Sequence, residues 1–267
     1  THRRYGPWTV LAEPRQEFAA PLVEAGLTCC LRGFTAAARY QPAAAAVAAL
    51  RRLAAGREEV AVRLAVRAAT VGRELVETLR SPADTAAAVP PLPGLGLLSE
   101  LLAVAAADPA PLSATGWAAA VLEELGRGSG PLGSRVPPAK RRDFLSRAAV
   151  ATERQLAAAD QSRRPALWLR LASLRTAAGR PREAVALLEQ VVSDSQAGRS
   201  VLSQREVARQ LEEAAGSESD RAAACQLFRA AAIGRQAAAG AIWGWGGLAG
   251  RISKRAFGDD DDEAPAV

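Results

Sequence analysis

The chain has 267 residues, of which 49% are apolar and 23% are charged; this excludes wholesale disorder and allows a sizeable core. Aromatic residues make up only 4%, alanine is abundant, and the β-branched and aromatic runs that build sheets are scarce, so we expect an all-α fold. The net charge of +6 permits contact with nucleic acid, but the arginines are scattered beside glutamates, which is typical of solvated helix faces.

The N-terminal half begins with a predicted extended arm over residues 1–14, which contains Pro7 and Pro14. Residues 15–125 are predicted to form a helical region, because apolar positions recur at helical spacing and are interrupted by proline and glycine. A Pro-rich stretch over 89–94 separates the first three predicted helices from the next two. The predicted helices are 15–40, 42–55, 57–79, 95–107 and 113–125.

The C-terminal half follows a Gly/Pro-rich stretch over 126–138, which we interpret as a linker between two halves. Short loops join the helices after it, so neighbouring helices are expected to run antiparallel as hairpins. Repeated hairpins of this size indicate an α-solenoid over 139–235. The predicted helices here are 139–160, 165–178, 181–193, 201–215 and 220–233.

One hairpin carries a recognisable spacing of apolar and small residues. The pattern Trp168-x2-Leu171-Ala172-x6-Gly179-x4-Ala184-x3-Leu188 resembles a tetratricopeptide repeat (TPR), a helix-turn-helix unit of 34 residues. The large side chains suit the groove between packed helices, and the alanines suit a close helix crossing. Gly179 is expected to take the left-handed cap that ends the first helix.

A second unit with the same spacing is weaker. It consists of Leu211 on its first helix and Ala224-x3-Phe228 on its second. Glu212 replaces the small residue of the pattern, and Arg175 in the first unit replaces the usual tyrosine. A generic helical bundle with a coincidental pattern is the alternative interpretation.

The resemblance implies a function as well as a fold. TPR repeats bind peptides or partner proteins in a concave groove and do not catalyse reactions. On the first helix of the repeat we expect Arg170, Ser173 and Arg175 to contact the partner, because arginine suits an acidic peptide or a carboxylate terminus.

The segment 236–258 is rich in glycine and contains Trp243 and Trp245. Three interpretations remain open for it: a packed capping segment, docking into a partner protein, and membrane contact through residues 236–250, whose uncharged stretch is shorter than the ~20 residues a spanning helix needs. The acidic tail over 259–267 is expected to be disordered and solubilising, and binding to a basic partner is the alternative.

Catalytic chemistry has little support in the sequence. The only histidine is His2, which lies in the terminal arm, so a Ser-His or Cys-His pair would depend on it. The three cysteines lack metal-ligand spacing, and no phosphate-binding loop is present. We therefore expect no catalytic, cofactor or metal site.

These features predict a non-catalytic interaction scaffold, an adaptor or assembly factor, that binds other proteins within a larger complex. The alternatives are an accessory subunit of an organellar complex, such as a photosynthetic complex or a ribosome, and an RNA-binding solenoid, which the lack of aromatic platforms disfavours. The odd cysteine count favours a reducing intracellular compartment. Methionine is absent, which either a removed plastid or mitochondrial transit peptide or an excerpt of a longer chain would explain.

Overall fold

The computed structural model describes residues 39–80, 92–193, 201–218 and 221–238. Within these ranges the chain is all-helical, which confirms the predicted fold class for the described residues. It divides into two compact units, unit 1 (Thr1–Arg141) and unit 2 (Arg142–Val267). The predicted arm, all but the last two residues of the predicted helix over 15–40, and the segment holding Trp243 and Trp245 lie outside the described residues.

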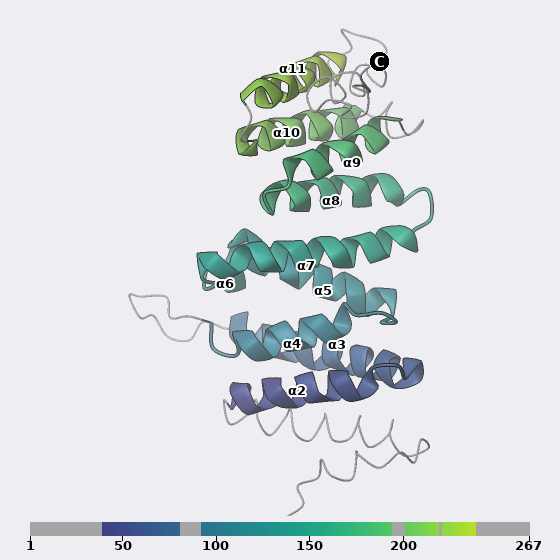
Figure 1. The fold of residues 1–267 in the computed structure, drawn as a ribbon, viewed down its shortest axis with the longest axis vertical. Helices are drawn as coiled ribbons and strands as arrows, with labels where there is room; N and C mark the ends of the chain where they lie inside the picture. Colours follow the sequence, from purple (N-terminus) through teal and green to yellow (C-terminus); the bar gives the residue numbers. More distant parts are fainter. Residues whose placement is uncertain (1–38, 81–91, 194–200, 219–220, 239–267) are drawn as a thin grey trace, which may run out of the picture. The chain divides into compact units, whose positions relative to one another are not determined.

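Unit 1 is built around its most apolar helix, α4. Helix α4 contacts α2, α3 and α5, while α3 and α5 also contact each other. Short turns join these helices, apart from the undescribed stretch between α3 and α4 (Figure 1). The described helices of this unit are α2 (Tyr40–Ala54), α3 (Glu58–Arg80), α4 (Leu95–Ala105), α5 (Leu112–Arg127) and α6 (Gly130–Gly133).

The composition of α4 explains its central place. A helix with so few polar residues has to be largely buried, because most of its surface does not suit solvent. Its only charged residue, Glu100, pairs with Arg51 on α2 at 3.6 Å between Oε2 and Nη1. Leu95 at the start of α4 is half-buried, whereas its other four leucines have no exposed surface and form the centre of the unit: Leu97, Leu98, Leu101 and Leu102.

The stretch predicted as a linker over 126–138 is instead a packed part of unit 1. Leu132 and Val136 are buried, with 0% and 2% of their surface exposed. Arg135 donates a hydrogen bond from Nη1 to the carbonyl oxygen of Leu79 at the end of α3, at 3.1 Å. The glycines and prolines shape the short helix α6 and its turns, and unit 1 ends only at Arg141.

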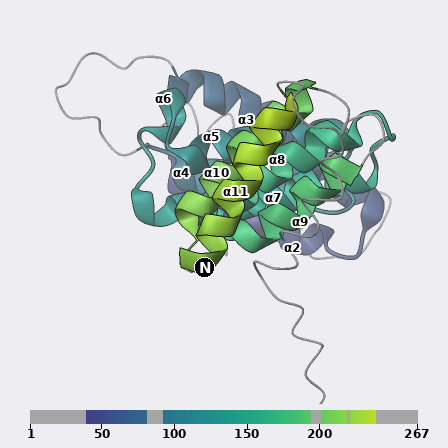
Figure 2. The ribbon, with the colours of Figure 1, turned by 90° about the horizontal axis from the view of Figure 1, so that it is seen from above.

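Unit 2 begins within the first turns of α7. Helices α8 and α9 contact each other and both contact α10, which in turn contacts α11. In Figure 2, α11 is nearest the viewer and lies over α10. The helices are α7 (Pro138–Ala157), α8 (Arg164–Ala177), α9 (Pro181–Ser193), α10 (Val201–Ser217) and α11 (Arg221–Ala238).

The turn between α8 and α9 forms as the sequence predicts. Gly179 has a φ of +80°, a left-handed conformation that strains any residue with a Cβ. Its amide donates to the carbonyl of Thr176 at 2.9 Å, and the amide of Arg180 donates to the carbonyl of Arg175 at 2.8 Å. This pair of hydrogen bonds is the Schellman motif, which ends α8 and lets Pro181 begin α9.

The core of unit 2 contains most of the residues that the repeat pattern assigned to packing. The buried cluster includes four of them, namely Ala172, Ala184, Leu188 and Leu211, and the half-buried Trp168 packs against it. Leu171 is also buried, with 2% of its surface exposed. The small residues at these positions therefore lie where α8, α9 and α10 meet.

The expected packing positions on α11 are wrong by one residue. Phe228 is 49% exposed and Ala224 is only half-buried. The preceding residues Ala223 and Leu227 are buried instead, and a shift of one residue turns a side chain by about 100° at 3.6 residues per turn. Ala230 and Ala231 on α11 are also buried.

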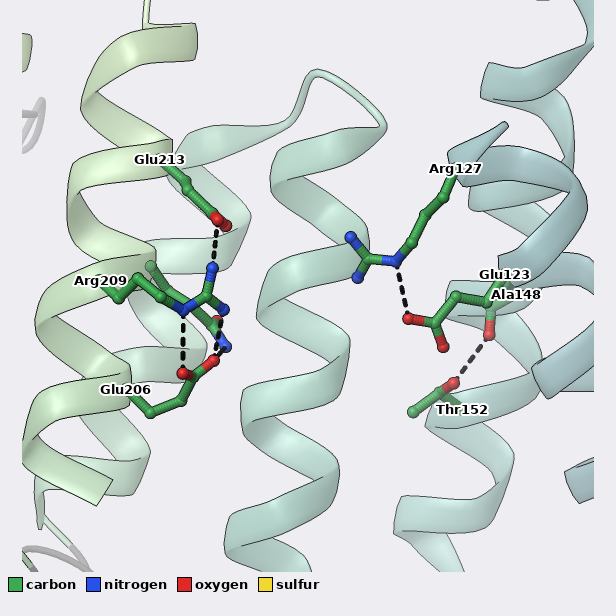
Figure 3. A network of polar contacts seen from close by, with 8 residues as sticks. Glu123, Arg127, Ala148, Thr152, Glu206, Arg209 and Glu213 are labelled. Carbon is green, nitrogen blue, oxygen red and sulfur yellow. Dashed lines mark hydrogen bonds and ion pairs between the residues drawn. The ribbon is translucent and has the colours of Figure 1, made fainter. Parts of the chain in front are cut away.

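Many exposed arginines are committed to ion pairs on their own helix. On α10, Arg209 is held between Glu206 and Glu213, and its Nε donates to Glu206 Oε2 at 2.9 Å (Figure 3). The hydrogen bond from Arg209 lowers the pKa of Glu206. On α5, Arg127 donates in the same way to Glu123 at 2.9 Å. These are the solvated helix faces that the charge pattern predicts.

Candidate protein-binding groove

A hollow of about 440 Å³ lies between α3 and α5 in unit 1. Each helix contributes four lining residues at the spacing i, i+3, i+4 and i+7, so each wall is a single helix face. We call this hollow the Trp117 groove. Its lining residues are Arg73, Val76, Glu77 and Arg80 from α3, and Trp117, Ala120, Val121 and Glu124 from α5.

The two walls of the Trp117 groove run in the same direction. At one end, the guanidinium carbon of Arg73 lies 5.8 Å from the centre of the Trp117 ring. At the other end, Nη2 of Arg80 lies 2.7 Å from Oε2 of Glu124. Both pairs join residues that are 44 apart in the sequence. Equal separations at both ends mean that α3 and α5 are parallel and in constant register.

The Trp117 ring packs directly against the backbone of α3, because residue 72 is a glycine and has no side chain. A Cβ added to Gly72 would lie 2.2 Å from Cη2 of Trp117, well inside van der Waals contact. Trp117 is half-buried, so the indole is held on one side and accessible on the other. Glycine therefore places a large, rigid ring at the mouth of the groove.

Replacing Gly72 by alanine is expected to displace the indole and to lower the free energy of unfolding of unit 1 by about 1–3 kcal/mol, as overpacking does. The indole must move as a whole, because the atoms that the new methyl group meets belong to a rigid ring. Near-ultraviolet circular dichroism and urea unfolding would measure the two effects. An unchanged near-ultraviolet spectrum would contradict the packing of the Trp117 ring against Gly72.

The groove has an apolar floor and a charged rim. Val76 and Val121, the valine floor, are 2% and 4% exposed. Arg73, Glu77 and Ala120 are exposed. An apolar floor under a polar rim is the arrangement of the core of a protein–protein interface.

The charges of the rim are distributed unevenly along the groove. Both carboxylates converge on Arg80, which lies 3.3 Å from Glu77 and 2.7 Å from Glu124. The hydrogen bond with Glu124 raises the pKa of Arg80. Arg73 contacts the Trp117 ring and forms no ion pair among the described residues. The Arg73 end of the groove therefore carries positive charge that the Arg80 end does not.

The residues expected to contact a partner on α8 are placed differently from the prediction. Arg175 is only 12% exposed and pairs with Glu153 on α7 and Glu183 on α9, the latter at 3.2 Å. Ser173 is buried and Arg170 is half-buried. The prediction of an open arginine face is therefore wrong for Arg175, whose two ion pairs join α7, α8 and α9, and for Ser173, which is buried.

The sequence held one signal for the Trp117 groove that the repeat pattern did not use. Trp117 is a lone aromatic residue on an alanine-rich helix, and the charged face of α3 repeats at helical spacing. The sequence did not show that α3 and α5 are neighbours, because α4 lies between them in the chain.

A larger hollow of about 630 Å³ lies where α2 and α4 end and α3 begins. Alanine is the most frequent residue in its walls, and its charged residues have both signs: Arg51, Arg57, Glu58 and Asp108. Arg51 is already paired with Glu100. This lining has no aromatic residue and no net preference for one charge, so it favours no class of ligand.

Among the described residues, no cluster of three or more His, Cys, Asp and Glu side chains could hold a metal ion. None of the helices described is both long and apolar enough to cross a bilayer. No protein-family model, curated protein or solved structure matches this chain. Its function therefore has to be argued from the chemistry of the Trp117 groove.

Proposed function

We propose that this chain is a non-catalytic interaction scaffold and that its Trp117 groove binds a segment of a partner protein. The observation that carries the proposal is the half-buried Trp117, held between Gly72 and Arg73 above the valine floor. Tryptophan and arginine dominate the binding energy of protein interfaces, above all where they surround a desolvated pocket. A ring that is fixed before binding loses little further entropy when a partner arrives.

The proposal includes a helical-repeat architecture of the TPR kind. Helix α3 and helix α5 run parallel, with the same 44-residue separation at both ends of the groove. Parallel helices from successive hairpins form the binding faces of α-solenoids. The tight α8–α9 hairpin, with its Gly179 turn and small packing residues, supports the same architecture in unit 2.

A site-specific cross-linker tests the proposal directly. A photoreactive amino acid at Ala120, inside the groove, is expected to capture one partner protein in extracts of the cells that make this protein. The same amino acid at Val66, which is 49% exposed on α3 and does not line the groove, is the control position. Mass spectrometry would identify the products.

A matched pair of charge reversals completes this experiment. Arg73→Glu changes the rim of the groove, while Arg63→Glu makes the same change on α3 in an exposed pair with Glu59. We expect Arg73→Glu to abolish capture at Ala120 and Arg63→Glu to leave it intact. Identical products at Ala120 and Val66, or capture that ignores Arg73→Glu, would overturn the proposal.

Washing with salt distinguishes an adaptor, which binds its partner reversibly, from a permanent accessory subunit of a complex. An adaptor's partner is expected to dissociate at high salt, because exposed charge pairs are screened. The partners of a permanent accessory subunit are expected to remain in stoichiometric amounts. Quantifying the captured proteins before and after the wash distinguishes the two.

A further inference from the structure

The dimensions of the Trp117 groove indicate the shape of its occupant. Each wall spans eight residues of helix, from i to i+7, and these seven steps correspond to a rise of about 10 Å at 1.5 Å per residue. The walls are parallel and in register from Arg73 and Trp117 to Arg80 and Glu124. A helix packs into such a groove by inserting a ridge of side chains spaced three and four residues apart. An amphipathic helix in a groove is a recurrent mode of peptide recognition.

The charges indicate the composition and direction of the occupant. Arg73 is the rim cation that no carboxylate neutralises among the described residues, so its end of the groove attracts a carboxylate. Glu77 and Glu124 surround Arg80 at the other end, so a second carboxylate would be repelled there. The middle of the groove, over the valine floor, accepts apolar side chains.

We infer that the Trp117 groove takes an amphipathic α-helix of a partner protein, with a carboxylate against Arg73 and apolar side chains on Trp117 and the valine floor. The inference rests on the proposed function and names the partner of the same site. It also fixes the direction of the partner helix, because its acidic turn has to lie at the Arg73 end.

Single-stranded RNA fits the groove less well. RNA-binding sites combine exposed aromatic platforms with a positive track for the phosphates. Here the Trp117 ring already carries the guanidinium of Arg73, and two carboxylates line the same hollow. A phosphate chain along the groove would meet Glu77 and Glu124 within about two helical turns.

Three labelled synthetic peptides provide a defined test with the full chain. The first is a helix-forming peptide of about 15 residues, long enough for measurable helicity, with leucines at i, i+3, i+4 and i+7 and glutamates on the turn before the first leucine. The second replaces those glutamates by lysines, and the third keeps the composition but scrambles the leucine spacing. A labelled oligouridylate of matched length serves as the RNA probe. Fluorescence anisotropy measures binding.

The acidic peptide is expected to bind, and the scrambled peptide and the oligouridylate are not. Arg73→Glu is expected to weaken the acidic peptide by at least about tenfold, because like charges then face each other. The same variant is expected to bind the lysine peptide better than the unchanged chain does. Arg63→Glu is the matched control and is expected to leave both affinities within about twofold, as for a surface charge outside an interface.

Each other outcome has a definite meaning. Equal binding of the acidic and scrambled peptides, or no gain for the lysine peptide with Arg73→Glu, overturns the inference. Binding of the oligouridylate alone overturns it in favour of RNA. If no peptide binds while Ala120 still captures a protein that depends on Arg73, the helical partner is wrong and the scaffold stands. If capture at Ala120 also fails, both proposals fall.

Discussion

Replacing Leu188 by alanine is expected to lower the free energy of unfolding of unit 2 by about 3–5 kcal/mol, the range for large-to-small changes in a closed core. Leu188 is 1% exposed and belongs to a buried cluster of side chains from four helices, α8 to α11. Its neighbours in the cluster include Ala184, Val185 and Leu211. Alanine would leave a cavity there, because the helices around it are already closely packed and relax only partly.

Leu187→Ala is the matched control, because Leu187 is the next residue on α9 and is only half-buried at the edge of the same cluster. Its effect is expected to be smaller, since solvent already reaches the site. Amide hydrogen exchange should be followed separately for α3–α5 and α8–α10, because a chain with two units need not unfold in one step. Equal loss of protection in the two variants would contradict the assignment of Leu188 to the core.

Replacing Gly133 by alanine is expected to lower the free energy of unfolding of unit 1 by about 3 kcal/mol, at the upper end of the range for overpacking. The added Cβ would lie 2.2 Å from the carbonyl oxygen of Glu124 and 3.0 Å from the carbonyl carbon of Gly128. Both atoms belong to the backbone, so no side-chain rotation can relieve the clash. Helix α6 would have to move away from α5.

The control for this prediction is Gly96→Ala on α4. A Cβ at Gly96 would meet no atom within 4 Å. Alanine there is expected to raise the free energy of unfolding by about 0.5–1 kcal/mol through its better helix propensity. Urea unfolding followed by circular dichroism would compare the two variants. Similar stabilities would show that the close approach of α6 to α5 does not constrain the fold.

Helix positions and the α8–α9 turn could be predicted from the sequence. The periodicity predicted helices over 57–79 and 181–193, where the structure has Glu58–Arg80 and Pro181–Ser193. Gly179 followed by Pro181 predicted the turn, because only a left-handed residue followed by a helix-starting proline fits there. Local signals of this kind need no knowledge of distant neighbours.

Positions that depend on tertiary packing could not be predicted in the same way. Ala224 and Ala223 are the same residue type, so the sequence did not decide which of them faces the core, and the expected position of Phe228 was wrong as a result. Glycine and proline between 126 and 138 indicated a linker, because local composition does not show that Leu132 is buried.

The candidate site was missed for a related reason. Arg175 was expected to contact a partner because arginine on the first helix of the repeat-like hairpin suits an acidic peptide, but its partners Glu153 and Glu183 lie on other helices of this chain. The Trp117 groove joins residues 44 apart, and a pattern within one helix does not identify its neighbour. The role of Gly72, which is to leave room for the Trp117 ring, becomes clear only from the packing of the two helices.

The contacts beyond α5 determine where unit 1 can be cut from the rest of the chain. The carbonyl of Leu79 receives its hydrogen bond from Arg135, and Arg141 donates from Nε to the carbonyl of Val136 at 3.1 Å. A fragment that stops at residue 126 would discard these donors together with the buried Leu132. A fragment of unit 1 that preserves the structure of the Trp117 groove should therefore extend through Arg141. Such a fragment ends within the first turn of α7.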